Sequence, residues 1–448
     1  MKKLFGTDGV RGVANTELTP ELAFKLGKAG AHILAKNATG TPRILIGKDG
    51  RRSGDMLEAA LTAGLCSIGA EVYQAGILPT PAVAYLIQRY KFDAGIMITA
   101  SHNPMADNGI KFFSSKGFKL PDQLEEEIEA LIYTNATLPC PEGEGVGIVR
   151  TYPYALEDYA SFVVSTVPNL RLDGMKIALD CANGATSVIA PIIFEKLGAD
   201  VHTLHNRPNG ININANCGST HMDSVRKFVT SHHLNLGLAF DGDGDRMFAV
   251  DENGQEIDGD RILAICGLDL FENNQLAKNT IVATVMSNQG LEVFCRERNI
   301  TLFRTDVGDR YVLKKMIEDD LSLGGEQSGH LIFRKHSTTG DGILAGVQLL
   351  SVLYRKKKSM AEMAKLVEIF PQVLINAKVS NDKKHQLQAD PQIKKALAEV
   401  EANLSADERI LVRPSGTEPL VRVMIEGRDA AKITEWATKL VQIIEERG

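Results

Sequence analysis

Short apolar runs alternate with longer stretches in which apolar residues recur every three or four positions along much of the chain. Between residues 41 and 100 this pattern predicts a strand at 44–46, a helix at 55–69, a strand at 71–74, a helix at 81–89 and a strand at 94–99. Strands that alternate with helices at this spacing are typical of a mainly parallel sheet covered by helices. Upstream, Thr19 and Pro20 are predicted to begin another helix.

The same alternation restarts twice, after the Pro- and Gly-rich stretch 139–147 and again after residues 251–254. The second series predicts a strand at 175–180, a helix at 190–197 and a strand at 200–204. The third predicts a helix at 261–271, a strand at 280–284, a helix at 290–298 and a strand at 301–304. The series share a pattern, without a strong residue-by-residue repeat.

The last 80 or so residues differ, because predicted strands at 373–379, 410–412 and 420–425 outnumber the helices there. The fold class expected is therefore α/β, with three similar α/β mixed-sheet domains followed by a smaller α+β C-terminal domain. The expected domains span 1–150, 151–253, 254–369 and 370–448.

Composition limits what the protein does. At 448 residues, with 24% charged and 44% hydrophobic residues, the chain is ordinary for a globular protein of several domains. A net charge of −6 offers no general attraction to nucleic acid or to an anionic membrane. The absence of a secretory signal and of a membrane-length apolar run, together with six scattered cysteines, favours a cytoplasmic protein.

The most informative segment is the loop 241–246, in which Asp241, Asp243 and Asp245 alternate with glycines after the apolar run 236–240. Alternate spacing in a loop loosened by glycine lets three carboxylates turn toward one point. Hard oxygen ligands of this kind suit Mg²⁺, Ca²⁺ or Mn²⁺ rather than zinc. The loop therefore predicts a divalent-cation site and chemistry on a phosphate.

This loop has two alternative interpretations, an EF-hand and a solvated turn. The three acids and Glu252 occupy the first, third, fifth and twelfth positions of an EF-hand, but the sixth position holds Arg246 where an EF-hand requires glycine. The flanking runs 236–240 and 247–250 are also strand-like, whereas an EF-hand lies between helices. A solvated acidic turn is the remaining alternative, because Gly and Asp are common turn residues.

Three further polar loops follow strand-like or Gly-rich segments, where ligands collect in open α/β sheets. In the loop 99–104, the hydroxyl of Ser101 is placed to act as a nucleophile or phosphoryl carrier, although a serine beside a histidine is usually only a turn. The loop 324–330 offers polar side chains between glycines. The loop 413–419, with Arg422, offers hydroxyls and guanidiniums that suit a phosphate monoester.

Together these loops resemble the α-D-phosphohexomutase superfamily, and the resemblance spans the whole chain. The motifs that carry it are Ser101-His102-Asn103-Pro104, the loop 241–246, Gly325-Glu326-Gln327-Ser328-Gly329-His330 and Arg413-Pro414-Ser415-Gly416-Thr417-Glu418-Pro419. Within the superfamily, residues 5–12, Ala100 and Gln327 resemble the bacterial phosphoglucosamine mutase branch.

The resemblance implies an enzyme that interconverts glucosamine 6-phosphate and glucosamine 1-phosphate in a central cleft, for UDP-N-acetylglucosamine and cell-envelope synthesis. Ser101 would be a phosphoserine, and a hexosamine or hexose 1,6-bisphosphate would be the intermediate and activator. One Mg²⁺ per chain would be held by Ser101, Asp241, Asp243 and Asp245. The other residues implied near the reacting phosphoryl group are Arg246, Arg11, His102 and Lys111.

The resemblance also implies residues that bind the phosphosugar substrate, namely Glu326, Ser328 and His330 for the sugar, and Arg413, Ser415, Gly416, Thr417 and Arg422 for the phosphate that does not react. The attacking hydroxyl needs a general base. The choice among Lys111, His102 and His330 stays open. A homodimer is a candidate assembly on the resemblance alone.

Three alternative functions use the same residues differently. A phosphoglucomutase/phosphomannomutase of broader hexose specificity would use the same site. A phosphatase that forms an aspartyl-phosphate on Asp241 would leave Ser101 without a role. A sugar-phosphate sensor would bind the ligand without isomerising it.

Overall fold

The computed structural model describes residues 3–6, 8–34, 36, 40–384, 387, 390–415 and 419–448. The chain forms two compact units, one comprising Met1–Val285 and Phe303–Ala364, the other Met286–Leu302 and Lys365–Gly448. Within the described ranges, no helix is both long enough and apolar enough to cross a membrane.

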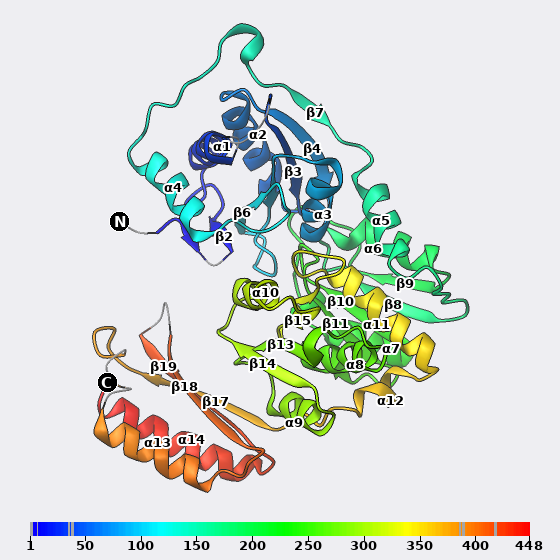
Figure 1. Cartoon of the computed structure of the whole chain (residues 1–448), viewed down its shortest axis with the longest axis vertical. Coiled ribbons are helices and arrows are strands. Elements are labelled where there is room, and N and C mark those ends of the chain that lie inside the picture. Colours follow the sequence, from blue (N-terminus) through cyan, green and yellow to red (C-terminus); the bar gives the residue numbers. More distant parts are fainter. Residues whose placement is uncertain are drawn as a thin grey trace. The chain divides into compact units, whose positions relative to one another are not determined.

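Among the described residues, the N-terminal sheet has seven strands in the order β1-β2-β6-β5-β3-β4-β7. Strands β2, β6, β3, β4 and β7 of this sheet are labelled in Figure 1. Its strands are β1 (Phe5–Gly6), β2 (Gly9–Val13), β3 (Arg43–Lys48), β4 (Glu71–Ile77), β5 (Ala94–Ile98), β6 (Asp107–Ser114) and β7 (Val149–Thr151). The accompanying helices are α1 (Pro20–Leu34), α2 (Ser53–Cys66), α3 (Thr80–Tyr90) and α4 (Asp122–Tyr133). Strand β3 is parallel to β4 and β5, as the pattern between residues 41 and 100 predicted.

The second sheet has the order β12-β11-β10-β8-β9. Its strands are β8 (Lys176–Asp180), β9 (Asp200–Leu204), β10 (Leu236–Phe240), β11 (Met247–Asp251) and β12 (Glu256–Ile257). Helices α5 (Ala155–Ser165), α6 (Thr186–Lys196) and α7 (Asp223–Ser231) occur in the same part of the chain. Strands β10 and β11 pair antiparallel on either side of the acidic loop, which confirms the strands predicted there.

The third sheet has the order β14-β13-β15-β16. Its strands are β13 (Thr280–Thr284), β14 (Thr301–Thr305), β15 (Leu323–Gly325) and β16 (Leu331–Phe333). The helices here are α8 (Gly259–Glu272), α9 (Gln289–Glu297), α10 (Asp309–Glu318), α11 (Gly342–Lys356) and α12 (Met360–Ala364). Short 3₁₀ turns at Gly143–Gly145, Gly218–Thr220 and Ala277–Asn279 complete the connections.

The three sheets share one arrangement of four strands. In each, the first strand of the series lies between the second and the third, and the fourth strand pairs antiparallel with the third; the orders are β4-β3-β5-β6, β9-β8-β10-β11 and β14-β13-β15-β16. The connections from the third to the fourth strand are the Ser101 loop, the acidic loop and the loop 326–330. Three of the four predicted site loops thus occupy equivalent positions in three similar domains.

In the described residues of the C-terminal part, the structure has the sheet β17-β19-β18 and two α-helices. Its elements are β17 (Gln372–Lys378), α13 (Pro391–Asn403), β18 (Arg409–Pro414), β19 (Leu420–Glu426) and α14 (Ala430–Glu445). Ile433, Leu440 and Ile444 of α14 are buried in a core with Val423 of β19, and Trp436 packs against this core. The smaller α+β C-terminal domain is confirmed.

Candidate active site

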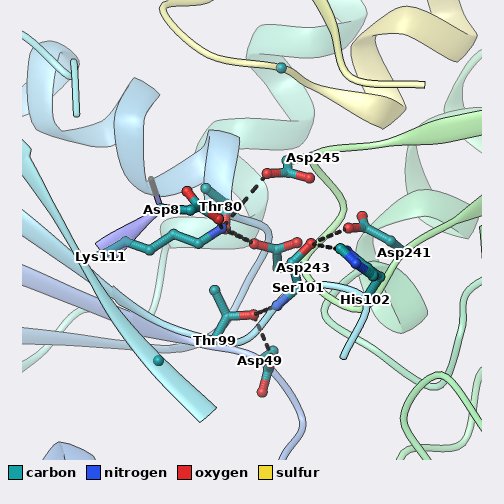
Figure 2. Close-up of polar contacts among 12 residues, drawn as sticks. Asp8, Asp49, Thr80, Thr99, Ser101, His102, Lys111, Asp241, Asp243 and Asp245 are labelled. Carbon is teal, nitrogen blue, oxygen red and sulfur yellow. Dashed lines mark hydrogen bonds and ion pairs between the residues drawn. The ribbon is translucent and has the colours of Figure 1, made fainter. Parts of the chain in front are cut away.

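Ser101 lies three residues beyond the end of β5, and its side chain points at the acidic loop of the next domain (Figure 2). The residue is 1% exposed, and its φ of 52° lies in the left-handed region that residues other than glycine seldom adopt. Its N–H donates to Thr99 Oγ1 at 2.9 Å, and its Oγ donates to Asp241 Oδ2 at 2.7 Å. The hydroxyl predicted as a phosphoryl carrier is therefore fixed against the predicted cation ligands.

The three alternating acids converge as their spacing predicted. One carboxylate oxygen from each of Asp241, Asp243 and Asp245 lies within 4.8 Å of the others, and all three residues are buried. In the described part of the chain, Oδ1 of Asp243 and Oδ1 of Asp245 are buried without a hydrogen-bond partner. Buried carboxylate oxygens that lack a donor are costly, and a divalent cation would satisfy them. This donor set fits Mg²⁺.

Lys111 of β6 enters the same cluster from the first domain (Figure 2). Its Nζ lies 2.8 Å from Asp243, 3.0 Å from Asp8 and 3.7 Å from Asp245. Burial alone would lower the pKa of this ammonium, but Asp243, Asp8 and Asp245 raise it above its usual value. Lys111 is therefore a buried cation in this arrangement.

The acids of the cluster are held in different electrostatic environments. Burial, with repulsion from Asp245 and Asp243, raises the pKa of Asp241 well above its usual value. Burial acts in the same direction on Asp245, but Lys111 and His330 outweigh it and lower the pKa of that carboxyl. Asp241 also accepts the Ser101 hydrogen bond, and a bound cation would relieve the repulsion among the acids.

A second layer of charges surrounds the cluster. Asp8 pairs with Arg11, with Lys111 and with Lys119, while Lys119 reaches Asp309 at the start of α10 at 2.6 Å. Although burial opposes ionisation of Asp8, these three cations lower its pKa well below the usual range. Carboxylates and cations thus alternate around the site.

His102 lies beside the reactive hydroxyl, with Nδ1 at 3.4 Å from Ser101 Oγ. Burial, followed by the guanidiniums of Arg246 and Arg11, lowers the pKa of His102 to about 4. The imidazole is therefore neutral at pH 7 and keeps a lone pair.

His330, which belongs to the third domain, lies beside the acid cluster. Its Nδ1 lies 3.6 Å from Asp245 Oδ2 and its Nε2 lies 3.5 Å from Asp309 Oδ2. Burial would lower its pKa, but the two carboxylates raise it. The N–H of Gly340 donates to Nε2 at 2.9 Å. Because Nε2 accepts this hydrogen bond, the ring that forms it is neutral and carries its proton on Nδ1, which faces Asp245.

The remaining residues of the loop 326–330 lie close to Arg246. A backbone bridge joins Arg246 to His330. Burial would lower the pKa of the Arg246 guanidinium, but Asp245, Asp241 and Glu326 raise it. Glu326 accepts the N–H of Gly308 at 3.2 Å, and burial raises the pKa of its carboxyl. Ser328 is half-buried.

The fourth predicted loop belongs to the second compact unit. Arg413 of β18 and Arg422 of β19 are directly opposite in the antiparallel register, and burial together with Arg422 lowers the pKa of Arg413. Guanidiniums at facing positions repel each other, which a phosphate between them would relieve. Ser415 is buried, while Gly416 and Thr417 lie outside the described residues.

Sequence reasoning did not single out several residues that hold the site. Thr80, at the start of α3, donates its hydroxyl to Asp243 at 2.6 Å. Asp8, Lys119 and Asp309 form the second layer of charge. Of these, only Asp8 had a usable signal, because it belongs to the N-terminal motif 5–12 that supported the resemblance.

Comparison with known proteins places this site in a family. Models of the four phosphoglucomutase/phosphomannomutase domains match residues 2–138 (alpha/beta/alpha domain I), 157–254 (domain II), 258–370 (domain III) and 374–443 (the C-terminal domain). The chain belongs to the phosphoglucomutase/phosphomannomutase family, part of the α-D-phosphohexomutase superfamily.

Two similar proteins carry a more specific name than the family does. The chain is 55% identical to the phosphoglucosamine mutase of Acetivibrio thermocellus and 54% identical to that of Ruminiclostridium cellulolyticum, each over the full length of both proteins.

Solved structures share the fold at lower identity. A phosphoglucomutase/phosphomannomutase family protein from Burkholderia thailandensis matches with a TM-score of 0.82 at 24% identity, covering 99% of this chain and 98% of the other. The N-acetylphosphoglucosamine mutase of Aspergillus fumigatus, solved with GlcNAc-6P and magnesium, matches with a TM-score of 0.69 at 16% identity, covering 99% and 96%.

Proposed function

We propose that this chain interconverts glucosamine 6-phosphate and glucosamine 1-phosphate in the cytoplasm. The single observation that carries the mechanism is the 2.7 Å hydrogen bond from Ser101 Oγ to Asp241 at the edge of the acid cluster. It sets a phosphorylatable hydroxyl beside ligands for a cation. The choice of substrate is supported by the full-length relatives, which are phosphoglucosamine mutases.

The reaction proceeds by two phosphoryl transfers. The free hydroxyl of glucosamine 6-phosphate attacks the phosphorus of phosphoserine 101, the bond from phosphorus to Oγ breaks, and the hydroxyl proton leaves to a base. Glucosamine 1,6-bisphosphate results. After the intermediate reorients in the site, Ser101 Oγ loses its proton to a base and attacks the phosphorus of the 6-phosphate. The bond from phosphorus to O6 breaks and O6 takes up a proton, so that the enzyme is phosphorylated again and glucosamine 1-phosphate is released.

Asp241, Asp243, Asp245 and an oxygen of the Ser101 phosphate would hold one Mg²⁺, which, when bound, would neutralise charge on the transferring phosphoryl group. The chain contributes fixed positive charge of its own. Lys111 is anchored between Asp8 and Asp243, so its ammonium is held in place before substrate binds. A preorganised charge of this kind stabilises a transition state without having to reorient during the reaction.

The sugar and the second phosphate need separate contacts. Glu326 and Ser328 are assigned to the sugar hydroxyls, and Arg413, Ser415, Gly416, Thr417 and Arg422 to the phosphate that does not react. The facing guanidiniums of Arg413 and Arg422 support this assignment, because an anion between them would remove their repulsion.

Three residues remain candidates for the base, and their surroundings differ. The ammonium of Lys111 is paired with carboxylates and has no free lone pair. Nε2 of His330 accepts the Gly340 N–H, so its lone pair is engaged. His102 is neutral at pH 7 and lies beside Ser101 Oγ. The arrangement favours His102, and the pH dependence of kcat in His102→Gln and His330→Gln variants compares the two histidines directly.

The test of the proposed function is a comparison of kcat/KM for glucosamine 6-phosphate, glucose 6-phosphate and mannose 6-phosphate, with a Ser101→Ala control. We expect the amino sugar to be preferred and the variant to lose nearly all activity. A clear hexose preference would reassign the chain to a phosphoglucomutase/phosphomannomutase. Full activity of Ser101→Ala would overturn the mechanism.

A further inference from the structure

The backbone carbonyl of Ser101 is held by two side chains outside its own loop. It accepts a hydrogen bond from Asn214 Nδ2 at 2.8 Å and another from Arg51 Nη2 at 3.0 Å. The same two donors also bind the carbonyl of Asn103, at 3.0 and 2.9 Å. The left-handed turn at Ser101 is thus clamped at two of its carbonyls.

Asn214 comes from the second domain, in the connection that follows β9, so it joins the domain of the acidic loop to the Ser101 loop. It is 8% exposed, and its own N–H donates to the carbonyl of Ala182 at 2.9 Å. Gly242 of the acidic loop lies against both partners, because a Cβ at that position would stand 2.5 Å from the Ser101 carbonyl oxygen and 2.9 Å from Asn214 Nδ2. The amide therefore sits where three loops of the site meet.

Arg51 supplies the other half of the clamp from within the first domain. Its guanidinium is held by Asp49 at 2.9 Å, and Asp49 also accepts the hydroxyl of Thr99 at 2.7 Å, which in turn accepts the N–H of Ser101. These bonds fix the peptide groups on both sides of Ser101. With the peptide planes fixed, the direction of the Cα–Cβ bond is determined, so only rotation about χ1 remains. The hydrogen bond from Oγ to Asp241 then selects the rotamer.

We propose that Asn214 is a positioning residue for phosphoryl transfer at Ser101, an inference that rests on the proposed function. Its amide holds the Ser101 carbonyl, and through it the strained turn that aims Oγ at Asp241. Misplacing a reacting group by about 1 Å can slow a reaction by about a hundredfold. Asn214 therefore acts on the transfer step and not on sugar binding.

The loop that carries Asn214 also provides a matched control. Asn216 is two residues away, has a φ of 53° against 56° for Asn214, and is exposed. Replacing either asparagine by alanine puts a residue with a Cβ and no side-chain amide into the same left-handed conformation, so the backbone strain is matched. Only Asn214→Ala removes the bonds to the Ser101 loop.

The experiment compares wild type, Asn214→Ala, Asn214→Asp and Asn216→Ala by kcat, by KM for glucosamine 6-phosphate, and by amide hydrogen exchange of peptides covering residues 99–107. We expect Asn214→Ala to lower kcat about 30-fold, equivalent to about 2 kcal/mol, with KM within twofold and faster exchange in 99–107. Asn214→Asp, which lacks the N–H donor, should lose at least as much, and Asn216→Ala should match wild type.

The inference is overturned if exchange in 99–107 is the same in Asn214→Ala and Asn216→Ala, whatever the activity. It is also overturned if the two alanine variants lose activity equally, or if the loss lies entirely in KM. An inactive wild type would instead refute the proposed function, while the exchange measurement would still decide whether Asn214 holds the Ser101 loop.

Discussion

Replacing Lys111 with methionine tests how charge is balanced in the buried cluster. Methionine preserves much of the length of the side chain but removes the ammonium from between Asp8 and Asp243. At 2.8 Å and an effective dielectric constant of about 20, the attraction to Asp243 alone is about 6 kcal/mol, which the desolvation of both groups partly offsets. Breaking a buried pair in this way costs about 3–5 kcal/mol of stability.

The metal-free Lys111→Met protein should therefore unfold more easily than wild type by about that amount. Mg²⁺ should stabilise the variant more than the wild type, because the cation then binds carboxylates that no ammonium neutralises. Each tenfold gain in affinity for Mg²⁺ adds about 1.4 kcal/mol to the free energy of unfolding when Mg²⁺ is saturating.

Calorimetric unfolding in EDTA and in excess Mg²⁺ measures both effects. Lys116→Met, the same substitution at an exposed position five residues away, controls for the loss of a positive charge. The reasoning is refuted if metal-free Lys111→Met is as stable as wild type, or if Mg²⁺ stabilises the two proteins equally.

Two further predictions concern histidines. The hydrogen bond to Asp180 raises the pKa of His205, so the stability that His205 contributes should be complete below the unfolded-state pKa of about 6.5 and decline as pH rises through the raised folded-state value. His205→Asn should thus cost about 1 kcal/mol at pH 5.5 and less at pH 8.5 in urea unfolding; a cost that grows with pH would contradict this. Gly340→Ala places a Cβ 2.5 Å from the His330 ring and should cost about 1–3 kcal/mol and lower kcat. Gly6→Ala should do neither, because its Cβ would lie at an ordinary contact distance of 3.7 Å from the Gly9 carbonyl oxygen. Equal stability and activity in the two alanine variants would show that the close packing of Gly340 against the His330 ring is not needed.

Local patterns were enough to predict the parts of the fold that lie close together in sequence. Strands β10 and β11 were predicted because a continuous apolar run precedes the three acids and a second one follows them. The convergence of those acids also follows from local spacing, since alternate residues in a loop with glycines can turn the same way. Three repeats of alternation predicted three similar domains, although strands β6, β15 and β16 were not among the predicted elements.

Other elements could not be predicted from the sequence pattern, for physical reasons. Strand β6 was not predicted, because Asn108 and Lys111 interrupt the apolar run expected of a buried strand. Both polar residues are buried in the structure. Helix α11 is buried on most of its surface, so it shows no polar stripe. Helix α6 begins at Thr186, four residues before the predicted start at 190, because it too is largely buried and its pattern is weak.

Lys119 and Asp309, in the second layer of the site, could not be predicted from the sequence. Lys119 contacts Asp8, 111 positions earlier, and Asp309, 190 positions later. No spacing in a single sequence connects such residues, and each has the charge of an ordinary surface side chain. Only the folded arrangement shows that they surround one buried cluster.

The central claim is that Ser101 stores and returns the phosphoryl group. The most direct measurement is a single turnover, in which enzyme carrying ³²P at Ser101 is mixed with unlabelled glucosamine 6-phosphate in the presence of Mg²⁺. The account predicts that the label leaves Ser101 and appears first in glucosamine 1,6-bisphosphate and then in glucosamine 1-phosphate. Label that remains on Ser101 while glucosamine 1-phosphate forms, or that is found on an aspartate, would contradict it.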